Sequence, residues 1–229
     1  MGLKIIGLLP MGGNGTRLGM PFPKPLAPAI FDTGIEPLYR HTLGQVRVVA
    51  DVVYAIVKTK ACGCLRDALE ADGVDLIETS ERTLPGALAH VGARLWSDYG
   101  DVLVAVALPD SIWRVEPDKS FADVVDAVRG DGAFALFHSG PGELDGVEVE
   151  GGRVKSVIPK TRFSLPGIGW GAFVVRAKVL ASLTPDETEG PQLGRLDMGW
   201  ANLGEYVDLG TPERYIRWHD TRWWLNGKR

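Results

Sequence analysis

Long apolar runs and an excess of positive charge are both missing from this sequence of 229 residues. The apolar run at residues 4–9 is too short to span a membrane, and no small-residue cleavage site follows it. The formal net charge is −4 at pH 7, which argues against a nucleic-acid surface. We therefore expect a cytoplasmic protein with neither a membrane nor a nucleic acid as its partner.

Cysteine is also scarce, since Cys62 and Cys64 are the only two and only Gly63 separates them. Cysteines this close rarely form an unstrained disulfide. Two thiolates without nearby histidines make a poor zinc site. We therefore expect both cysteines to be reduced, as is usual in the cytoplasm.

Repeats, linkers and low-complexity segments are absent as well. Apolar residues make up 45% of the chain and charged residues 24%, which is typical of a globular protein. The length suffices to bury a sizeable core. The simplest prediction is one domain over residues 1–229.

What the sequence does contain is an alternation of short apolar runs with helical patterns. Strands are predicted at residues 4–9, 51–57, 74–77, 101–108, 133–137 and 170–175, and helices at 37–49, 64–71, 85–96, 121–128 and 215–225. Gly151-Gly152 between two further strand patterns indicates a hairpin. The alternation predicts an α/β fold with a mostly parallel mixed sheet and helices on both faces.

The most informative segment is a glycine-rich loop that follows the first predicted strand. It consists of Gly12, Gly13, Asn14, Gly15, Thr16, Arg17 and Leu18. Three glycines in four positions let the backbone approach a ligand closely, and successive N–H groups can cradle phosphate oxygens. A plain turn with a surface arginine is the simpler interpretation of such a loop. Its position directly after a predicted strand favours the interpretation as a phosphate-binding loop.

A second basic element, Pro23-Lys24-Pro25, follows shortly after this loop. The prolines stiffen the chain and hold Lys24 in a defined place, where its charge can neutralise a phosphate. Together the two elements resemble the signature of the sugar-1-phosphate nucleotidyltransferases, and of the thymidylyl- and uridylyltransferases among them. The resemblance implies a Rossmann-like, glycosyltransferase-A-like domain. It also implies that the loop binds a nucleoside triphosphate and that Arg17 and Lys24 are catalytic.

Two aspartates are candidates for a metal site. Asp110 follows the apolar strand pattern, and ligands of open α/β sheets bind at the carboxyl ends of strands. Asp208 precedes Thr211, which is predicted to cap the last helix with Pro212 in its first position. The resemblance assigns Mg²⁺ to both aspartates. Pro109 and Tyr206 depart from the glycine and tryptophan that are usual in the family.

Weaker matches concern the two substrates. The resemblance implies that Pro85 and Gly86 open a helix against the nucleotide base, although a plain helix start explains them equally well. The family's glutamine before this segment is missing. Lys160 and Gly171 match positions beside the sugar phosphate, but Pro159 replaces the family's glutamate, which suggests an altered acceptor pocket.

The resemblance therefore predicts an enzyme that joins a nucleoside triphosphate to a sugar 1-phosphate with Mg²⁺ and releases pyrophosphate. Two alternatives stay open. One is a cytidylyl- or guanylyltransferase with a non-hexose acceptor, and the other is a non-catalytic sensor of sugar nucleotides. Aromatic residues of the last predicted helix, among them Trp218, Trp223 and Trp224, either cover the sheet, which is the simpler interpretation, or stay partly exposed and form a homodimer contact.

Overall fold

A computed structural model describes residues 4–12, 20, 22–31, 34–140, 143–160, 167–209 and 211–220 of the chain. Its strands are β1 (Ile5–Pro10), β2 (Pro28–Phe31), β3 (Gly34–Pro37), β4 (Val52–Lys58), β5 (Asp75–Thr79), β6 (Leu103–Ala107), β7 (Ser111–Val115), β8 (Gly132–Ser139), β9 (Gly146–Glu150), β10 (Arg153–Ile158), β11 (Gly167–Arg176) and β12 (Met198–Asp208). Its helices are α1 (Leu38–Arg47), α2 (Gly63–Ala71), α3 (Leu84–Tyr99), α4 (Phe121–Asp126), α5 (Ala177–Ala181), α6 (Glu189–Leu193) and α7 (Pro212–His219), with a short 3₁₀ turn, η2, at Lys24–Leu26.

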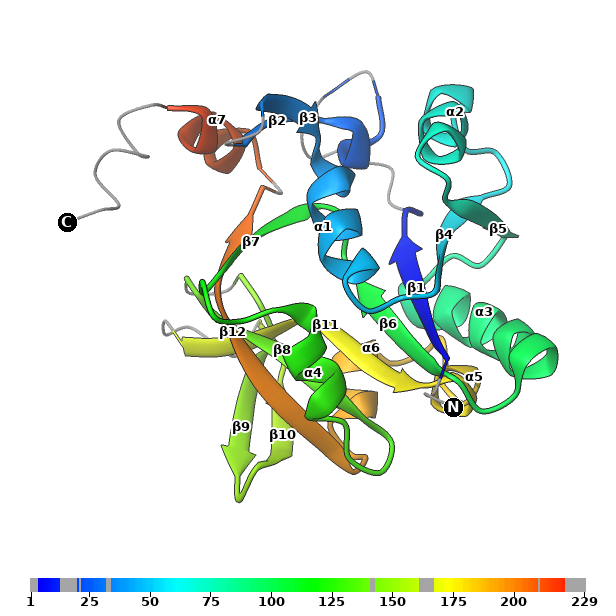
Figure 1. The fold of residues 1–229 in the computed structure, drawn as a ribbon, viewed down its shortest axis with the longest axis vertical. Coiled ribbons are helices and arrows are strands. Elements are labelled where there is room, and N and C mark those ends of the chain that lie inside the picture. The colour runs from blue at the N-terminus through cyan, green and yellow to red at the C-terminus, as the bar shows by residue number, and fades with distance from the viewer. Residues whose placement is uncertain are drawn as a thin grey trace.

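The main sheet has the strand order β5-β4-β1-β6-β11-β8-β12-β7, and the β9–β10 hairpin joins it through β11. The pairs β1–β4, β1–β6, β4–β5 and β8–β12 are parallel, whereas β11 and β7 run against their neighbours. Six strands of this path therefore share one direction, which confirms the predicted mostly parallel mixed sheet. Figure 1 shows the sheet running through the centre of the molecule.

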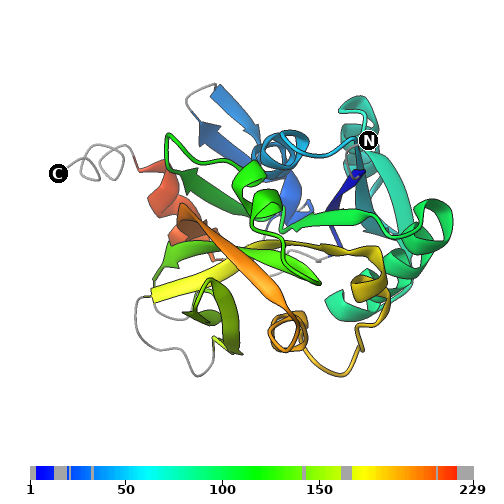
Figure 2. The same cartoon turned by 60° about the horizontal axis from the view of Figure 1, so that its bottom comes forward.

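Helices cover both faces of this sheet, as predicted. One apolar cluster contains Tyr39 and Leu43 of α1, Leu65 of α2 and Phe121 of α4. The other contains residues of α3, α5 and α6, with Leu88, Val91, Leu180 and Leu193 among them. The turned view in Figure 2 shows the two helix layers on opposite sides of the strands. The apolar strands β1 and β6 are buried between them.

Most local predictions are confirmed, with shifts of a few residues. The predicted hairpin turn at Gly151-Gly152 is present, and both glycines have positive φ angles of 59° and 77°. The last helix differs from its prediction of 215–225. Its described part ends at His219, because Asp220 leaves the helical region with φ −72° and ψ 111°.

The expectation of reduced cysteines is contradicted by the structure, where a disulfide joins Cys62 to Cys64. Cys62 is the N-cap of α2 and Cys64 lies in its first turn, so the chain bends between the two residues. This bend brings their Cα atoms to 5.4 Å, a separation that a disulfide can bridge. No helix in the described part of the chain is long and apolar enough to cross a membrane.

Candidate active site

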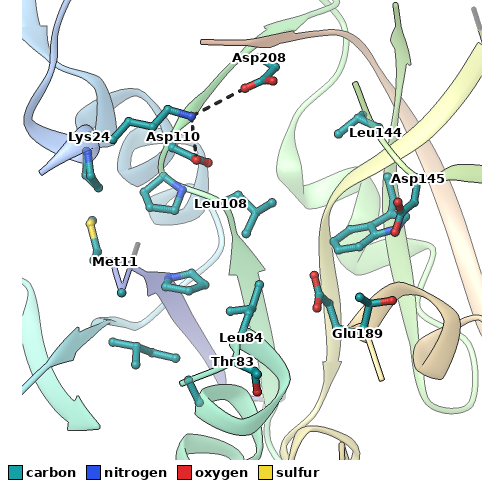
Figure 3. Close-up of a pocket in the computed structure, with 18 of the residues that line it drawn as sticks. Met11, Lys24, Thr83, Leu84, Leu108, Asp110, Leu144, Asp145, Glu189 and Asp208 are labelled. Atoms are coloured by element: carbon teal, nitrogen blue, oxygen red, sulfur yellow. Dashed lines mark hydrogen bonds and ion pairs between the residues drawn. The ribbon is translucent and has the colours of Figure 1, made fainter. Parts of the chain in front are cut away.

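A pocket lies at the carboxyl ends of β1, β4 and β6, where parallel α/β sheets place their ligands. Its volume is about 610 Å³, which is adequate for a nucleotide and a small acceptor. Figure 3 shows Lys24, Asp110 and Asp208 at one end and Leu144, Asp145 and Glu189 across the cavity. The pocket therefore brings together groups that lie far apart in the sequence.

Lys24 stands between the two predicted metal ligands. Its Nζ lies 2.8 Å from Asp110 Oδ2 and 3.7 Å from Asp208 Oδ1. Only 11% of the Lys24 side chain is exposed. Pro23 and Pro25 flank it in the η2 turn, where the carbonyl of Lys24 accepts a hydrogen bond from Ala27 N–H. The predicted stiff segment therefore holds the ammonium group beside both carboxylates.

Asp110 and Asp208 reach this point from neighbouring strands. Asp110 follows β6 and directly precedes β7, and Asp208 ends β12, which pairs with β7. The register of that pair sets Asp208 opposite Ser111, next to Asp110 in the chain. Beneath them lies Tyr206, whose pKa is raised well above its ordinary value by burial and then by the two negative charges.

The donor set fits Mg²⁺, which binds through one or two carboxylates and completes its shell with water and substrate phosphates. The two carboxylates already converge on one cation, the Lys24 ammonium. Within the described part of the chain, no group of three or more His, Cys, Asp or Glu side chains forms a metal cluster on its own. A divalent ion at this place would therefore depend on substrate oxygens as well.

The other predicted site residues are placed differently. Gly12 and Lys160 line the pocket, whereas Gly13, Asn14, Gly15, Thr16 and Arg17 lie outside the described residues. Pro85 and Gly86 are buried in the first turn of α3, and their neighbours Thr83, Leu84 and Ala87 form the pocket wall. Gly171 lies in the core, where a Cβ would meet Phe137 at 3.1 Å and Tyr206 at 3.0 Å.

The structure adds two basic groups on the side of Gly12. Lys58 ends β4, its stem covers Gly12, and its Nζ donates to the carbonyl oxygen of Glu81. Arg82 lines the pocket close to Thr83. Lys58 had a signal in the sequence, because it directly follows the strand predicted at residues 51–57, much as Asp110 follows the strand predicted at 101–108.

The opposite wall carries two carboxylates that the sequence did not single out. Asp145 Oδ1 accepts a hydrogen bond of 2.8 Å from Lys160 N–H, which fixes this wall beside the lysine. Burial raises the pKa of Glu189, and the nearby charge of Asp145 raises it further. Glu189 begins the short α6, for which the periodicity gave no prediction. The wall therefore presents oxygen acceptors, with the indole of Trp170 beside them.

No protein-family model matches the chain, and no curated protein matches it at a significant level. Solved structures do match. A Bacillus anthracis protein assigned as a glucose-1-phosphate thymidylyltransferase, solved with sucrose, has a TM-score of 0.73 at 16% identity, over 96% of this chain and 95% of that one. A UTP-bound UGPase from Acinetobacter baumannii has a TM-score of 0.72 at 14% identity, covering 99% and 98%.

The inositol-1-phosphate CTP transferase of T. maritima is similar too, with a TM-score of 0.67 at 14% identity, covering 93% of this chain and 92% of that one. These structures carry the Rossmann-like fold of nucleotidyltransferases, and this chain shares it nearly end to end. The fold that the resemblance implied is thereby confirmed.

Proposed function

We propose that this protein is a magnesium-dependent nucleotidyltransferase that joins a nucleoside triphosphate to a sugar 1-phosphate and releases pyrophosphate. The observation that carries this proposal is the convergence of Lys24, Asp110 and Asp208 inside the pocket. The similar structures include a UTP-bound UGPase and an inositol-1-phosphate CTP transferase, which supports the proposal. Gly12 and the glycine-rich loop after it would bind the triphosphate, with Arg17 at the loop's end.

In this reaction a phosphate oxygen of the acceptor attacks the α-phosphorus of the triphosphate. The bond between the α-phosphorus and the bridging oxygen breaks, and pyrophosphate leaves with that electron pair. No covalent enzyme intermediate is needed, because positioning and electrostatic stabilisation supply most of the catalysis. Lys24 neutralises charge on the reacting phosphate, and Lys160 orients the acceptor.

Asp110 and Asp208 would hold Mg²⁺, which would neutralise negative charge on the phosphates. Pairing with Lys24 keeps both carboxylates directed into the pocket. Asp145 and Glu189 offer acceptors for hydroxyl groups at the opposite wall. A cytoplasmic location, where triphosphates are abundant, is part of the same proposal.

A non-hexose acceptor is the second candidate. Pro159 precedes Lys160 where the family has a glutamate, and one similar structure is a CTP transferase for inositol 1-phosphate. Asp145 and Glu189 present carboxylates to the pocket from other segments of the chain. The part of the pocket that would bind the acceptor therefore differs from the family pattern. This difference supports a polyol phosphate as the acceptor in place of a hexose 1-phosphate.

The test is a panel of nucleoside triphosphates against sugar 1-phosphates and polyol phosphates, with pyrophosphate release as the readout. We expect release with Mg²⁺ for at least one pair and none in the presence of EDTA. The pair that reacts identifies the base and the acceptor. Triphosphate binding without turnover across the whole panel would support a non-catalytic sensor instead.

A further inference from the structure

Arg214 does not line the pocket itself but contacts two carboxylates that do. It belongs to the first turn of α7, close to the end of β12. Its Nη1 lies 2.6 Å from Asp208 Oδ2, and its Nη2 lies 3.6 Å from Glu143 Oε1. The guanidinium group thus spans two carboxylates from different parts of the chain.

The two oxygens of Asp208 are divided between two cations. Oδ2 accepts the short hydrogen bond from Arg214, whereas Oδ1 faces Lys24 at 3.7 Å. A guanidinium group can face two carboxylates with separate N–H groups held in one plane, as Arg214 does with Asp208 and Glu143, whereas a point charge has no such fixed geometry. Arg214 therefore determines which oxygen of Asp208 is directed into the pocket.

Arg214 is itself held in place at both ends. Thr211 caps α7 and its Oγ1 accepts a hydrogen bond of 3.4 Å from Arg214 N–H. Glu143 Oε2 accepts a hydrogen bond of 3.1 Å from Gly140 N–H, which anchors the second carboxylate to the backbone. The side chain of Arg214 is 34% exposed, so part of its surface is shielded from solvent. Because Arg214 is held in this way, its guanidinium group can hold the Asp208 side chain in one orientation.

We propose that Arg214 is a positioning residue that orients Asp208 for binding the divalent cation. This inference rests on the proposed function in one respect, namely that Asp110 and Asp208 form the metal-binding pair. Groups that hydrogen-bond to metal ligands fix their orientation, and removing them typically lowers metal affinity by about 10–100-fold. Arg214 acts in this way through Asp208, without contact with the reacting atoms.

The experiment measures binding of Mn²⁺, as a probe for Mg²⁺, by electron paramagnetic resonance with a non-hydrolysable triphosphate and no acceptor. We expect Arg214→Met to weaken Mn²⁺ binding by about tenfold or more. Arg214→Lys keeps the charge without the fork and should restore part of the loss. Arg195→Met is the matched control, because Arg195 forms an exposed bidentate pair with Glu187 at 2.7 and 2.6 Å, and neither residue lines the pocket.

A double-variant comparison separates orientation from general stability. In an Asp208→Asn background, Arg214→Met should have little further effect on Mn²⁺ binding, since its target is already altered. Unchanged or tighter Mn²⁺ binding in Arg214→Met overturns the proposal. The proposal is also overturned if Arg214→Met weakens Mn²⁺ binding equally in wild-type protein and in Asp208→Asn. Glu143→Gln serves as the second variant if Arg214→Met does not fold, and we expect it to weaken Mn²⁺ binding in the same direction.

The same measurements distinguish this inference from the proposed reaction. If wild-type protein binds Mn²⁺ and Arg214 variants weaken that binding while no pyrophosphate is released, only the proposed reaction fails. If wild-type protein binds no Mn²⁺, the role of Arg214 and the metal assignment both fail. Pyrophosphate release that continues in the presence of EDTA would also contradict the metal assignment.

Discussion

Lys24 shows what one side chain contributes to this site. A mostly buried ammonium group is stabilised only when carboxylates pair with it, and here Asp110 and Asp208 do so. The same ammonium keeps the two aspartates from repelling each other. Phosphate oxygens of a bound substrate would compete with the carboxylates for Lys24, because both are anionic hydrogen-bond acceptors.

The first prediction concerns this lysine. Lys24→Met should lower kcat for pyrophosphate release by about 100-fold or more, because a group acting on transition-state charge is lost. Lys155→Met is the control, since the side chain of Lys155 is 61% exposed in the β9–β10 hairpin and pairs with Glu150. Steady-state kinetics on both variants, with circular dichroism to verify folding, provide the test. A near-normal kcat in folded Lys24→Met would remove this residue from the mechanism.

At the scale of elements, α7 lies next to the site and contacts it through Arg214, which pairs with Asp208 and Glu143. Thr211 caps it and Pro212 occupies its first turn, as the sequence predicted. The Trp218 side chain is 2% exposed and packs with Ala29, Leu38, Ile112 and Leu209. Its Nε1 donates a hydrogen bond of 3.2 Å to the carbonyl oxygen of Ile30, and the Tyr215 hydroxyl donates to that of Pro28. The helix is thereby docked on β2, close to the turn that carries Lys24.

The second prediction concerns this docking. Trp218→Ala should lower the free energy of unfolding by about 3 kcal/mol or more, because a buried aromatic ring and its hydrogen bond are lost. Ile216→Ala is the control on the same helix, since Ile216 is 67% exposed and should change stability little. Urea unfolding followed by circular dichroism measures both. If both variants lower the free energy of unfolding by the same small amount, Trp218 does not hold α7 in place.

At the scale of the whole molecule, a charge network joins α1 to the end of α2. Arg40 Nε and Nη2 each lie 2.8 Å from an oxygen of Asp72, and the Tyr39 hydroxyl also donates to Asp72. Burial raises the pKa of Asp72, but the hydrogen bonds from Arg40 and Tyr39 outweigh it and leave the pKa lowered. Burial, followed by Asp72, raises the pKa of Tyr39 to about 12.

The third prediction follows from the lowered pKa of Asp72. Its carboxylate contributes stability above the pKa of the unfolded chain, and this contribution is lost as the pH falls through the folded-state value. Asp72→Asn should therefore cost about 1.5–3 kcal/mol near neutral pH, the usual worth of hydrogen bonds to a charged group. The cost should shrink in acid. Asp67→Asn, at an exposed position of α2, is the control, and urea unfolding across pH is the measurement. A pH-independent cost would contradict the prediction.

The homodimer suggested by the aromatic C-terminus stays a prediction, since Trp223 and Trp224 lie outside the described residues. The described part leaves Ile35 and Ile216 exposed at 71% and 67%. Light scattering measures the oligomeric state directly.

The sequence by itself determined the alternation of elements and pointed to the candidate site residues. Apolar periodicity depends only on neighbouring residues, so β1, β6 and α3 were predictable from it. Lys24, Asp110 and Asp208 were candidates because each stands beside a local signal (flanking prolines, a strand end or a helix cap) and because the motifs around them resemble those of a known family. Short or polar elements such as β2, β7 and α6 escaped prediction, since tertiary packing stabilises them more than their own sequence does.

Only the tertiary structure decided which distant groups meet. The sheet order places β12 between β8 and β7, and this order brings Asp208 beside Asp110 and Lys24. The docking of α7 then sets Arg214 against Asp208 and Glu143. Strand order and helix docking arise from the burial of apolar surface between distant segments. The spacing of residues along the sequence therefore does not predict which of them come together.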